Sequence, residues 1–261
     1  MIKNEVLDVI DKRISLRAYS GQPISSEEEN AIVNAAMRAP TAGNQMLYSM
    51  IIIRDPKKKA LLAELCDHQA FAAKAPLMIV FVADFQKWVD YYEKNDVKGF
   101  CEGKDYQFEA PQESDLFLAI EDTMIAAQNS VIAAESMDIG SCYIGDIMEN
   151  GEQIKECLSL PQYTMPIGMV VYGHYPENFP RLPKERFEKK FVVFEDTYQR
   201  LSGEDIDAMF QAEDRRYRSD NAVGAKNYAQ MFYARKTGAK FCKEMARSAR
   251  FWLKQWDGRL L

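Results

Sequence analysis

Apolar and polar residues along the chain alternate with two periods, one typical of helices and one of buried strands. Residues 1–12 carry apolar side chains at helical spacing, which predicts that the chain opens with a helix. Ser25 and Glu28 have the spacing of a capping box, so a second helix is predicted to begin there and to stop near Pro40. A third helical stretch is predicted between residues 57 and 74.

Four short runs of β-branched and apolar residues, each bounded by polar residues, predict buried strands at 48–53, 77–83, 141–144 and 166–172. Residues 116–137 are apolar on most faces of a helix, which predicts a long central helix buried on several sides. Because helices alternate with short buried strands, we expect an α/β or α+β fold in which helices cover both faces of a central sheet.

Two segments lack this alternation. Residues 93–112 mix glycine, charged and aromatic residues without a period, which favours a loop or a lid. Strand patterns fade after residue 183, and residues 204–256 are predicted to form an arm of two or three helices. The arm ends in three aromatic residues that would pack on a partner subunit if they are exposed: Phe251, Trp252 and Trp256.

Composition narrows the class of protein. The chain has 261 residues, 47% of them hydrophobic, and can bury a large core. No apolar run reaches the roughly 18 to 20 residues of a membrane span, and the N-terminus lacks the pattern of a signal peptide, so a cytoplasmic location is expected. Five scattered cysteines and two histidines predict neither a disulfide framework nor a metal site. The net charge of -6 argues against a nucleic-acid binder.

Arginines before the first predicted strand and after the last one are candidates for binding phosphate. Arg13, Ser15 and Arg17 follow the first predicted helix, where guanidinium groups and a hydroxyl can bind phosphate oxygens. A solvated basic turn is the alternative interpretation. Arg181 lies in a stiff extended segment between two prolines, which suits a second phosphate contact or an ordinary surface loop.

Three further segments could contact a flat ring. Gln69 carries a carboxamide that can accept from a ring N–H and donate to a ring oxygen, as the pyrimidine edge of a flavin requires, although a lone Gln is usually solvated. In the predicted turn before the first strand, glycine permits close backbone approach and asparagine offers a donor, although a simple turn has the same composition. These turn residues are Thr41, Ala42, Gly43 and Asn44.

The third segment ends a predicted strand, where glycine permits backbone contact with a ring and free amides can donate to flavin N5. It consists of Tyr143, Ile144, Gly145 and Asp146. Asp146 could instead cap the following helix. Together the segments could surround one large, flat, phosphorylated cofactor, which we interpret as flavin mononucleotide (FMN). A Gly-x-Gly-x-x-Gly element, which a nicotinamide enzyme of the Rossmann kind should show, is missing from the sequence.

In their order and spacing these segments resemble the nitroreductase family of FMN-dependent oxidoreductases, and within it the branch of major oxygen-insensitive NADPH nitroreductases and flavin reductases. Residues 13–17, including Ile14, look like the family's flavin-phosphate motif, residues 39–45 like its flavin loop, and residues 126–136 like its central helix. The resemblance covers about residues 6–198. It implies an α+β fold with a central mixed sheet flanked by helices.

The resemblance also implies a homodimer, in which long central helices pack across the interface and each of two flavin sites is built from both chains. On this basis residues 1–198 are expected to form the FMN-binding domain, and residues 199–261 a helical extension that packs on the partner subunit. The implied activity is ping-pong, two-electron transfer from NADH or NADPH through FMN to nitroaromatics, quinones or free flavins. No protein side chain need be catalytic, because the flavin carries the chemistry.

Several alternatives stay open. Phe100, Tyr106 and Phe108 lie in the segment that could cover the flavin, so they are candidates to shape the acceptor site, although core or dimer packing is as plausible for each. A non-catalytic flavin-binding or redox-sensing protein would need the same flavin contacts, and a reductive dehalogenase could share the scaffold. The basic residues between 235 and 259 could bind an anionic partner, but a solvated helix face over an apolar stripe explains them better. The sequence leaves the choice of nicotinamide and acceptor open.

Overall fold

The computed structural model describes residues 2–218 and 220–258. Met1, Ser219 and residues 259–261, which belong to ranges predicted above, lie outside this description. The chain forms two compact units. One consists of Met1–Pro183 together with Glu244–Leu261, and the other of Lys184–Lys243. The last residues of the chain therefore cluster with the sheet rather than with the helices that precede them.

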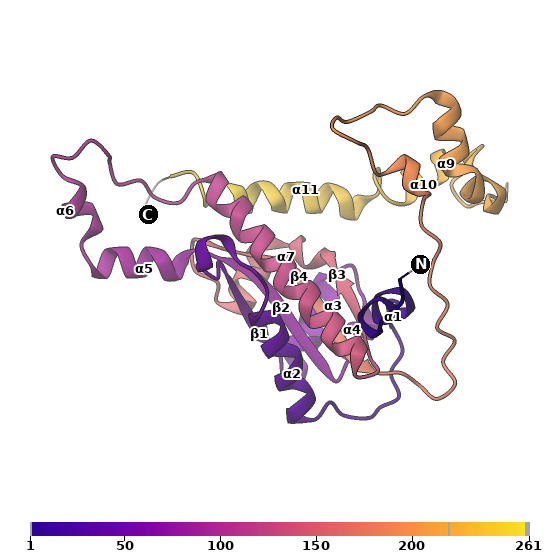
Figure 1. The fold of residues 1–261 in the computed structure, drawn as a ribbon, viewed down its shortest axis with the longest axis horizontal. Coiled ribbons are helices and arrows are strands. Elements are labelled where there is room, and N and C mark those ends of the chain that lie inside the picture. The colour runs from indigo at the N-terminus through magenta and orange to yellow at the C-terminus, as the bar shows by residue number, and fades with distance from the viewer. Residues whose placement is uncertain (1, 219, 259–261) are drawn as a thin grey trace. The chain divides into compact units, whose positions relative to one another are not determined.

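A four-stranded sheet forms the centre of the larger unit (Figure 1). Its strands are β1 (Tyr48–Ile52), β2 (Leu77–Asp84), β3 (Ile139–Ile144) and β4 (Thr164–His174), in the order β1-β2-β4-β3. The four predicted strands are confirmed, but every pair of neighbours is antiparallel, so the expectation of a mixed sheet is wrong. In the described part of the chain, parallel pairing is confined to one isolated bridge between Ser15 and Ser141.

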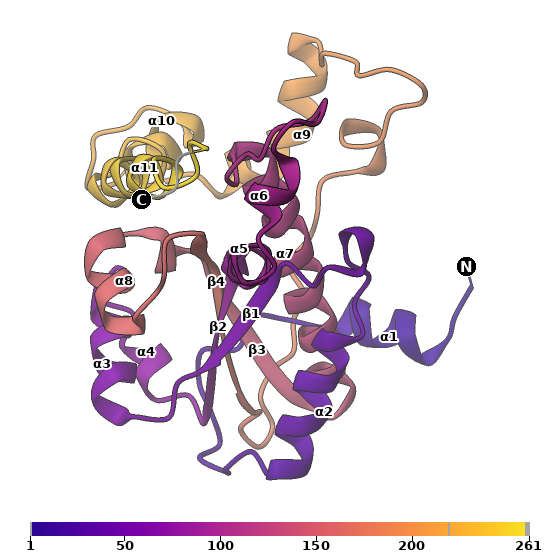
Figure 2. The same ribbon diagram turned by 90° about the vertical axis from the view of Figure 1, so that its left-hand side faces the viewer.

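Helices cover both faces of this sheet (Figure 2). These helices are α1 (Glu5–Lys12), α2 (Ser26–Met37), α3 (Pro56–Leu65), α4 (Ala70–Ala73), α7 (Glu113–Ser136) and α8 (Gly151–Leu158). All of them except α8 lie in segments predicted to be helical. Figure 2 shows α2 and α7 on one face and α3, α4 and α8 on the other. The predicted capping box is confirmed, since the Ser25 hydroxyl accepts from Glu28 N over 3.2 Å and the Ser25 amide donates to the Glu28 carboxylate over 2.7 Å.

The long helix α7 is the centre of one core layer. Leu116, Ala126 and Val131 are fully buried on it, as the nearly all-round apolar pattern predicted. By length and composition alone α7 is apolar enough to cross a membrane, so the expectation that no segment reaches this threshold is wrong. The physical reason is its place in the core, because a helix that packs on a sheet with one face and keeps apolar residues on another has few polar positions.

The segment between β2 and α7 is more regular than its composition indicated. It contains α5 (Gln86–Lys94) and α6 (Val97–Cys101), so the prediction of a loop throughout residues 93–112 is wrong for both helical parts. Asp96 joins the two helices in a left-handed conformation with φ 48°, and its side chain accepts from Gly99 N over 3.2 Å. This cap starts a helix too short to show a hydrophobic period. Residues 105–112 are irregular, as predicted.

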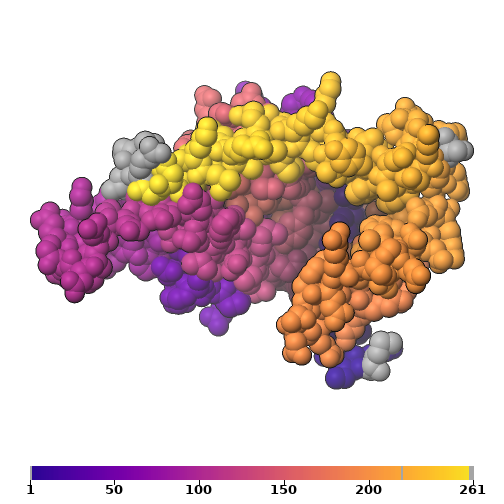
Figure 3. All heavy atoms as spheres, turned by 90° about the horizontal axis from the view of Figure 1, so that it is seen from above, coloured from indigo at the N-terminus to yellow at the C-terminus, as the bar shows by residue number. Residues whose placement is uncertain are grey.

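The arm predicted after residue 204 contains three helices, α9 (Gly203–Arg216), α10 (Tyr228–Arg235) and α11 (Lys240–Leu253). Trp252 and Trp256 are fully buried in the core of their own chain, so the expectation that the terminal aromatic residues await a partner is wrong for these two. The ring of Trp256 meets Tyr163 edge to face with centroids 5.7 Å apart. Figure 3 shows the C-terminal residues (yellow) along the magenta segment that leads into α7, where Gly258 N donates to Pro111 O over 3.2 Å.

Within the smaller unit, Lys184–Lys243, helices α9 and α10 enclose their own apolar contacts. The rings of Phe187 and Phe210 meet edge to face with centroids 5.2 Å apart. A short 3-10 turn, η3 (Lys189–Phe191), places Phe191 in the interior.

Candidate functional site

The predicted phosphate-binding segment runs alongside β3. Arg13 ends α1 in an extended conformation, and Leu16 behind it is fully buried and donates from its backbone N to Ser141 O over 2.9 Å. This pairing turns the side chains before and after Leu16 away from the core. Among the described residues no carboxylate lies within ion-pair distance of Arg13 or Arg17. Two guanidinium groups therefore remain available to an anionic ligand.

A second part of the site joins Gln69 to the end of β3. Gln69 precedes α4 in a loop whose Asp67 and His68 are both left-handed, each with φ 54°. Its Nε2 donates to Asp146 Oδ2 over 2.6 Å. Because a carboxylate can only accept, Gln69 must turn its NH₂ group toward Asp146, which leaves the carbonyl oxygen and the second amide hydrogen for a ligand.

The turn that carries Asp146 offers open backbone. It is the 3-10 turn η2 (Gly145–Met148), which follows Ile144 at the end of β3. A Cβ atom added to Gly145 would meet nothing within 4 Å, so a planar ring can approach the backbone there. Ile144 itself is buried in the core, and Tyr143 is half-buried with its hydroxyl 3.3 Å from Gln128 Oε1. Burial raises the pKa of the Tyr143 phenol, which therefore stays neutral.

The predicted flavin loop is fixed to α7 by a residue that the sequence interpretation missed. Asp122 is 3% exposed, and its two oxygens accept from Ala42 N over 2.8 Å and from Leu47 N over 3.1 Å. Gly43 and Asn44 adopt left-handed conformations with φ 55° and 56° and are exposed. The signal in the sequence was a carboxylate, next to Glu121, within a mostly apolar stretch of α7. The Thr41 hydroxyl also accepts from Met46 N over 2.9 Å.

Arg181 differs from the other two arginines because carboxylates already surround it. Its guanidinium lies 2.9 Å from Asp138 Oδ1 and 3.6 Å from Glu135 Oε1, and 3.7 Å from the centre of the Tyr175 ring. The Tyr175 hydroxyl donates to Glu135 Oε2 over 2.9 Å. Burial raises the pKa of the Glu135 carboxyl, while Tyr175 and then Arg181 oppose that rise. A phosphate would have to share Arg181 with these partners.

The structure thus brings the predicted residues into separate groups. Gln69 and Asp146 touch directly, and the segment with Arg13 and Arg17 pairs with the strand that leads to Asp146. No hydrogen bond or ion pair of the described residues links Thr41–Asn44 to either group.

Phe100 and Tyr106, two of the predicted acceptor-shaping residues, lie with their ring centroids 6.1 Å apart and are 57% and 53% exposed. The third, Phe108, is half-buried.

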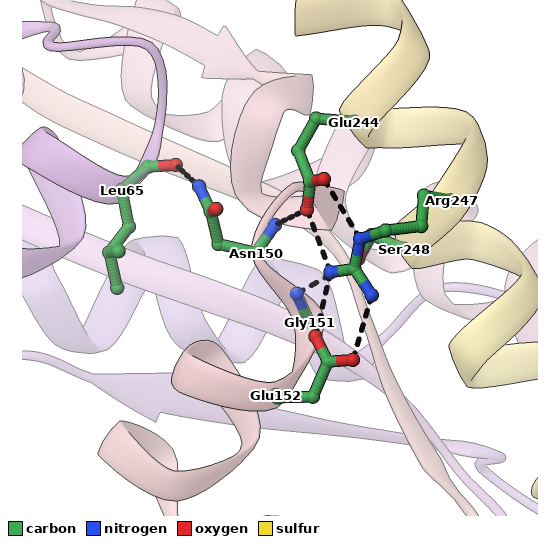
Figure 4. A network of polar contacts seen from close by, with 7 residues as sticks. All are labelled: Leu65, Asn150, Gly151, Glu152, Glu244, Arg247 and Ser248. Carbon is green, nitrogen blue, oxygen red and sulfur yellow. Dashed lines mark hydrogen bonds and ion pairs between the residues drawn. The ribbon is translucent and has the colours of Figure 1, made fainter.

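The C-terminal helix joins the start of α8 and the end of α3 through a polar network that the sequence did not indicate (Figure 4). Arg247 on α11 forms two 2.7 Å bonds to Glu152 and two 2.8 Å bonds to Glu244. Glu244 accepts from Asn150 N over 3.2 Å, and Asn150 Nδ2 donates to Leu65 O over 2.8 Å. The network therefore connects α11, the start of α8 and the end of α3, from which the loop to Gln69 departs.

Close packing accompanies this network. Gly151 N donates to Ser248 Oγ over 2.9 Å, and a Cβ atom on Gly151 would lie 2.7 Å from the same oxygen and 2.8 Å from Trp252 Nε1. Only glycine lets α11 approach α8 this closely.

Comparisons with known proteins agree with the fold. The family profile described as "Nitroreductase family" matches residues 10–174. The chain is 32% identical over 200 residues to an FMN reductase (NADPH) of Bacillus subtilis (strain 168), with 75% of each chain covered. It is 31% identical over 187 residues to an oxygen-insensitive NADPH nitroreductase of Salmonella typhimurium, with 72% of each covered.

Among solved structures, the chain matches nitroreductase A of Vibrio parahaemolyticus with a TM-score of 0.80 at 25% identity, over 99% of this chain and all of the other. The chain therefore belongs to the nitroreductase family, and both the family and the fold class expected from its motifs are confirmed.

Proposed function

We propose that this protein is a homodimeric, NAD(P)H-dependent FMN oxidoreductase that reduces nitroaromatics, quinones or free flavins. The observation that carries the proposal is the surface around β3, where, among the described residues, Arg13 and Arg17 have no carboxylate partner and the Gln69 carbonyl oxygen has no hydrogen-bond donor. Above Gly145 the same surface offers space for a flat ring. The relatives named as FMN reductase and NADPH nitroreductase support the cofactor and the class of reaction.

The residues present fit FMN. Arg13, Ser15 and Arg17 would hold the phosphate. Arg181 would be a further contact, in which the phosphate replaces one of the carboxylates that now pair with Arg181. Gln69 and Asp146 would face the pyrimidine edge, and the backbone of residues 143–146, which includes Ile144, would lie against the ring. Bound there, FMN would supply the two-electron transfer chemistry between the nicotinamide and the acceptor. The protein binds and orients, so no side chain needs to act as an acid or base.

A second chain completes the proposed site. The flavin loop Thr41–Asn44 projects exposed residues from its own attachment on α7 and makes no polar contact with the Gln69 group among the described residues. Helix α7 also exposes apolar side chains that a monomer would leave in water. These are Phe117, Leu118, Met124 and Ile125. A homodimer that covers them would bring the loop of one subunit to the flavin of the other.

Phe100, Tyr106 and Phe108 are proposed to shape the acceptor site as a lid over the open flavin face. Two of them are more than half exposed, and their ring centroids lie 6.1 Å apart, so a bound ligand could cover both rings. Phe108→Ala is expected to change KM for the acceptor. An unchanged KM for every acceptor would remove the lid from the proposal.

The helical extension 199–261 is proposed to contact the partner subunit through the part of its surface that stays exposed, such as Phe232 and Tyr233. A cytoplasmic location fits an enzyme that consumes NADH or NADPH. Steady-state oxidation of each nicotinamide, measured at several concentrations of a nitroaromatic or quinone, tests the function. Parallel double-reciprocal lines are expected for a ping-pong cycle. Tight FMN binding without acceptor-dependent oxidation would instead identify a non-catalytic flavin-binding protein.

A further inference from the structure

Glu149 is a buried carboxyl at the back of the Gln69–Asp146 contact. It follows η2 directly, and its backbone N donates to Asp146 O over 2.9 Å. The residue is only 5% exposed, and Oε1 has no hydrogen-bond partner in the described structure. A buried carboxyl with an unsatisfied oxygen is costly, so its surroundings decide whether it carries a charge.

Acidic groups face Glu149 from every element around it. Asp146 lies on η2, Asp67 on the loop after α3 and Glu244 on α11. Cys66 and His68 also face it, but burial keeps the Cys66 thiol neutral and His68 is bound to Glu64 over 2.8 Å. The guanidinium of Arg247, which bonds to Glu244, is already shared between Glu152 and Glu244. Burial first, and then the charge of Asp146, raise the pKa of Glu149 to about 7.

We propose that the Glu149 carboxyl is a positioning residue, which donates a hydrogen bond to Asp146 and thereby fixes the orientation of the Gln69 carboxamide toward the flavin. The inference rests on the proposed FMN site. Asp146 then accepts from Glu149 on one side and from Gln69 Nε2 on the other. With its NH₂ group held in this way, Gln69 presents its carbonyl oxygen to the N–H of the pyrimidine edge.

Loss of the proton would loosen this arrangement. Two adjacent carboxylates repel each other, so an ionised Glu149 pushes Asp146 away from its contact with Gln69. Gln69 stands beside two residues with φ 54°, Asp67 and His68, and such strained backbone persists only while its surroundings hold it. FMN binding therefore favours the protonated form of Glu149, and the affinity for FMN falls as pH rises through about 7.

The test is the dissociation constant of FMN for the full-length apoprotein between pH 6 and 8.5, measured by quenching of flavin fluorescence. For the wild type, Kd is expected to rise about tenfold over this range, as for loss of a hydrogen bond to a charged group. The second ionisation of the FMN phosphate, near pH 6, cannot produce this result, because a dianion should bind the arginines more tightly.

Three variants separate positioning from a merely structural role. In Glu149→Gln a neutral amide can still donate to Asp146, so FMN should bind with the wild-type Kd of pH 6 at every pH. Glu149→Ala should bind FMN more weakly throughout, without the pH dependence. The matched control is Glu152→Gln, because the pKa of Glu152 is lowered to about 2 by Arg247 and this exposed carboxylate does not titrate in the range.

A wild-type Kd that does not rise with pH would overturn the inference, and so would a Glu149→Gln variant that keeps the full pH dependence. The first of these results needs no variant, so poor folding of a mutant cannot obscure it. If the protein fails to bind FMN at any pH, the proposed function fails as well. If it binds FMN with a constant Kd, only the role of Glu149 is lost.

Discussion

The side-chain amide of Gln69 lies 2.6 Å from Asp146 Oδ2, and this contact joins the loop after α3 to the turn after β3. It leaves one face of the Gln69 carboxamide for the cofactor. Gln69→Leu roughly keeps the size of the side chain but removes the carboxamide. The variant therefore loses both the contact with Asp146 and the proposed hydrogen bonds to the pyrimidine edge of the flavin. We expect Kd for FMN to increase about tenfold in an equilibrium titration. Gln22→Leu, at an exposed position away from the proposed site, serves as the control and should bind as the wild type does.

Variants of the two arginines that have no carboxylate partner in the described structure should lose affinity for FMN and not for riboflavin. Arg13→Gln and Arg17→Gln should each weaken FMN binding by about 10- to 100-fold, the value of a charge-assisted hydrogen bond. Riboflavin lacks the phosphate, so its weaker binding should be unaffected. Titrations of both ligands, with Arg54→Gln as a surface control, check this prediction. Equal losses for FMN and riboflavin would contradict a phosphate-binding role.

Substitution of Asp122 should lower the stability of the fold without changing any group that would contact the flavin. Asp122→Asn replaces one carboxylate oxygen by an NH₂ group, which cannot accept a hydrogen bond. One of the two backbone amides, Ala42 N or Leu47 N, therefore loses its acceptor. A buried amide left without its acceptor should lower the free energy of unfolding by about 2 kcal/mol, measured by urea denaturation. Asp105→Asn, on an exposed turn, should leave the unfolding midpoint in place. Equal stability of both variants would show that the loop does not depend on α7.

The Arg247 network predicts a stability difference that depends on pH. Hydrogen bonds from Arg247 hold the pKa of Glu152 at about 2, below its ordinary value of 4.5, and that of Glu244 is lowered as well. A depressed folded-state pKa stabilises the protein above the unfolded value, and this stabilisation is lost as pH falls toward 2. Arg247→Gln should therefore be less stable than wild type at pH 7, with a gap that narrows below pH 4.5.

Thermal unfolding at pH 7 and at pH 3.5 measures this gap. Arg250→Gln on the same helix is the control, because Arg250 is exposed and forms no ion pair in the described structure. A gap that stays constant between the two pH values would contradict the assignment of these ion pairs.

Much of the larger unit, which contains the sheet, could be predicted because its helices and strands have patterns that are local in the sequence. Periodicity gave the four strands and helix α7, and the spacing of Ser25 and Glu28 gave the start of α2. Helix α6 escaped because five residues are too few for a hydrophobic period, and its start depends on the side chain of Asp96. The burial of Trp252 and Trp256 could not be predicted either, since it requires α11 to return to residues about 90 positions earlier in the chain.

The candidate site divides in the same way. Gln69 and Gly145 were predicted from the chemistry that a flavin needs, whereas the contacts of Asp122 and the burial of Glu149 exist only in the folded chain. Asp122 binds a loop 80 positions away in sequence. Arg181 shows the opposite case, because its residue type suggested a free phosphate anchor and the structure surrounds it with Asp138 and Glu135.

Anaerobic mixing of the FMN-loaded protein with NADH and with NADPH, in a stopped-flow instrument, tests the central claim most directly. The account predicts that the flavin absorbance near ~450 nm bleaches within a turnover with at least one donor, and that a nitroaromatic or quinone restores it. A protein that binds FMN but is bleached by neither donor would contradict the proposed oxidoreductase function.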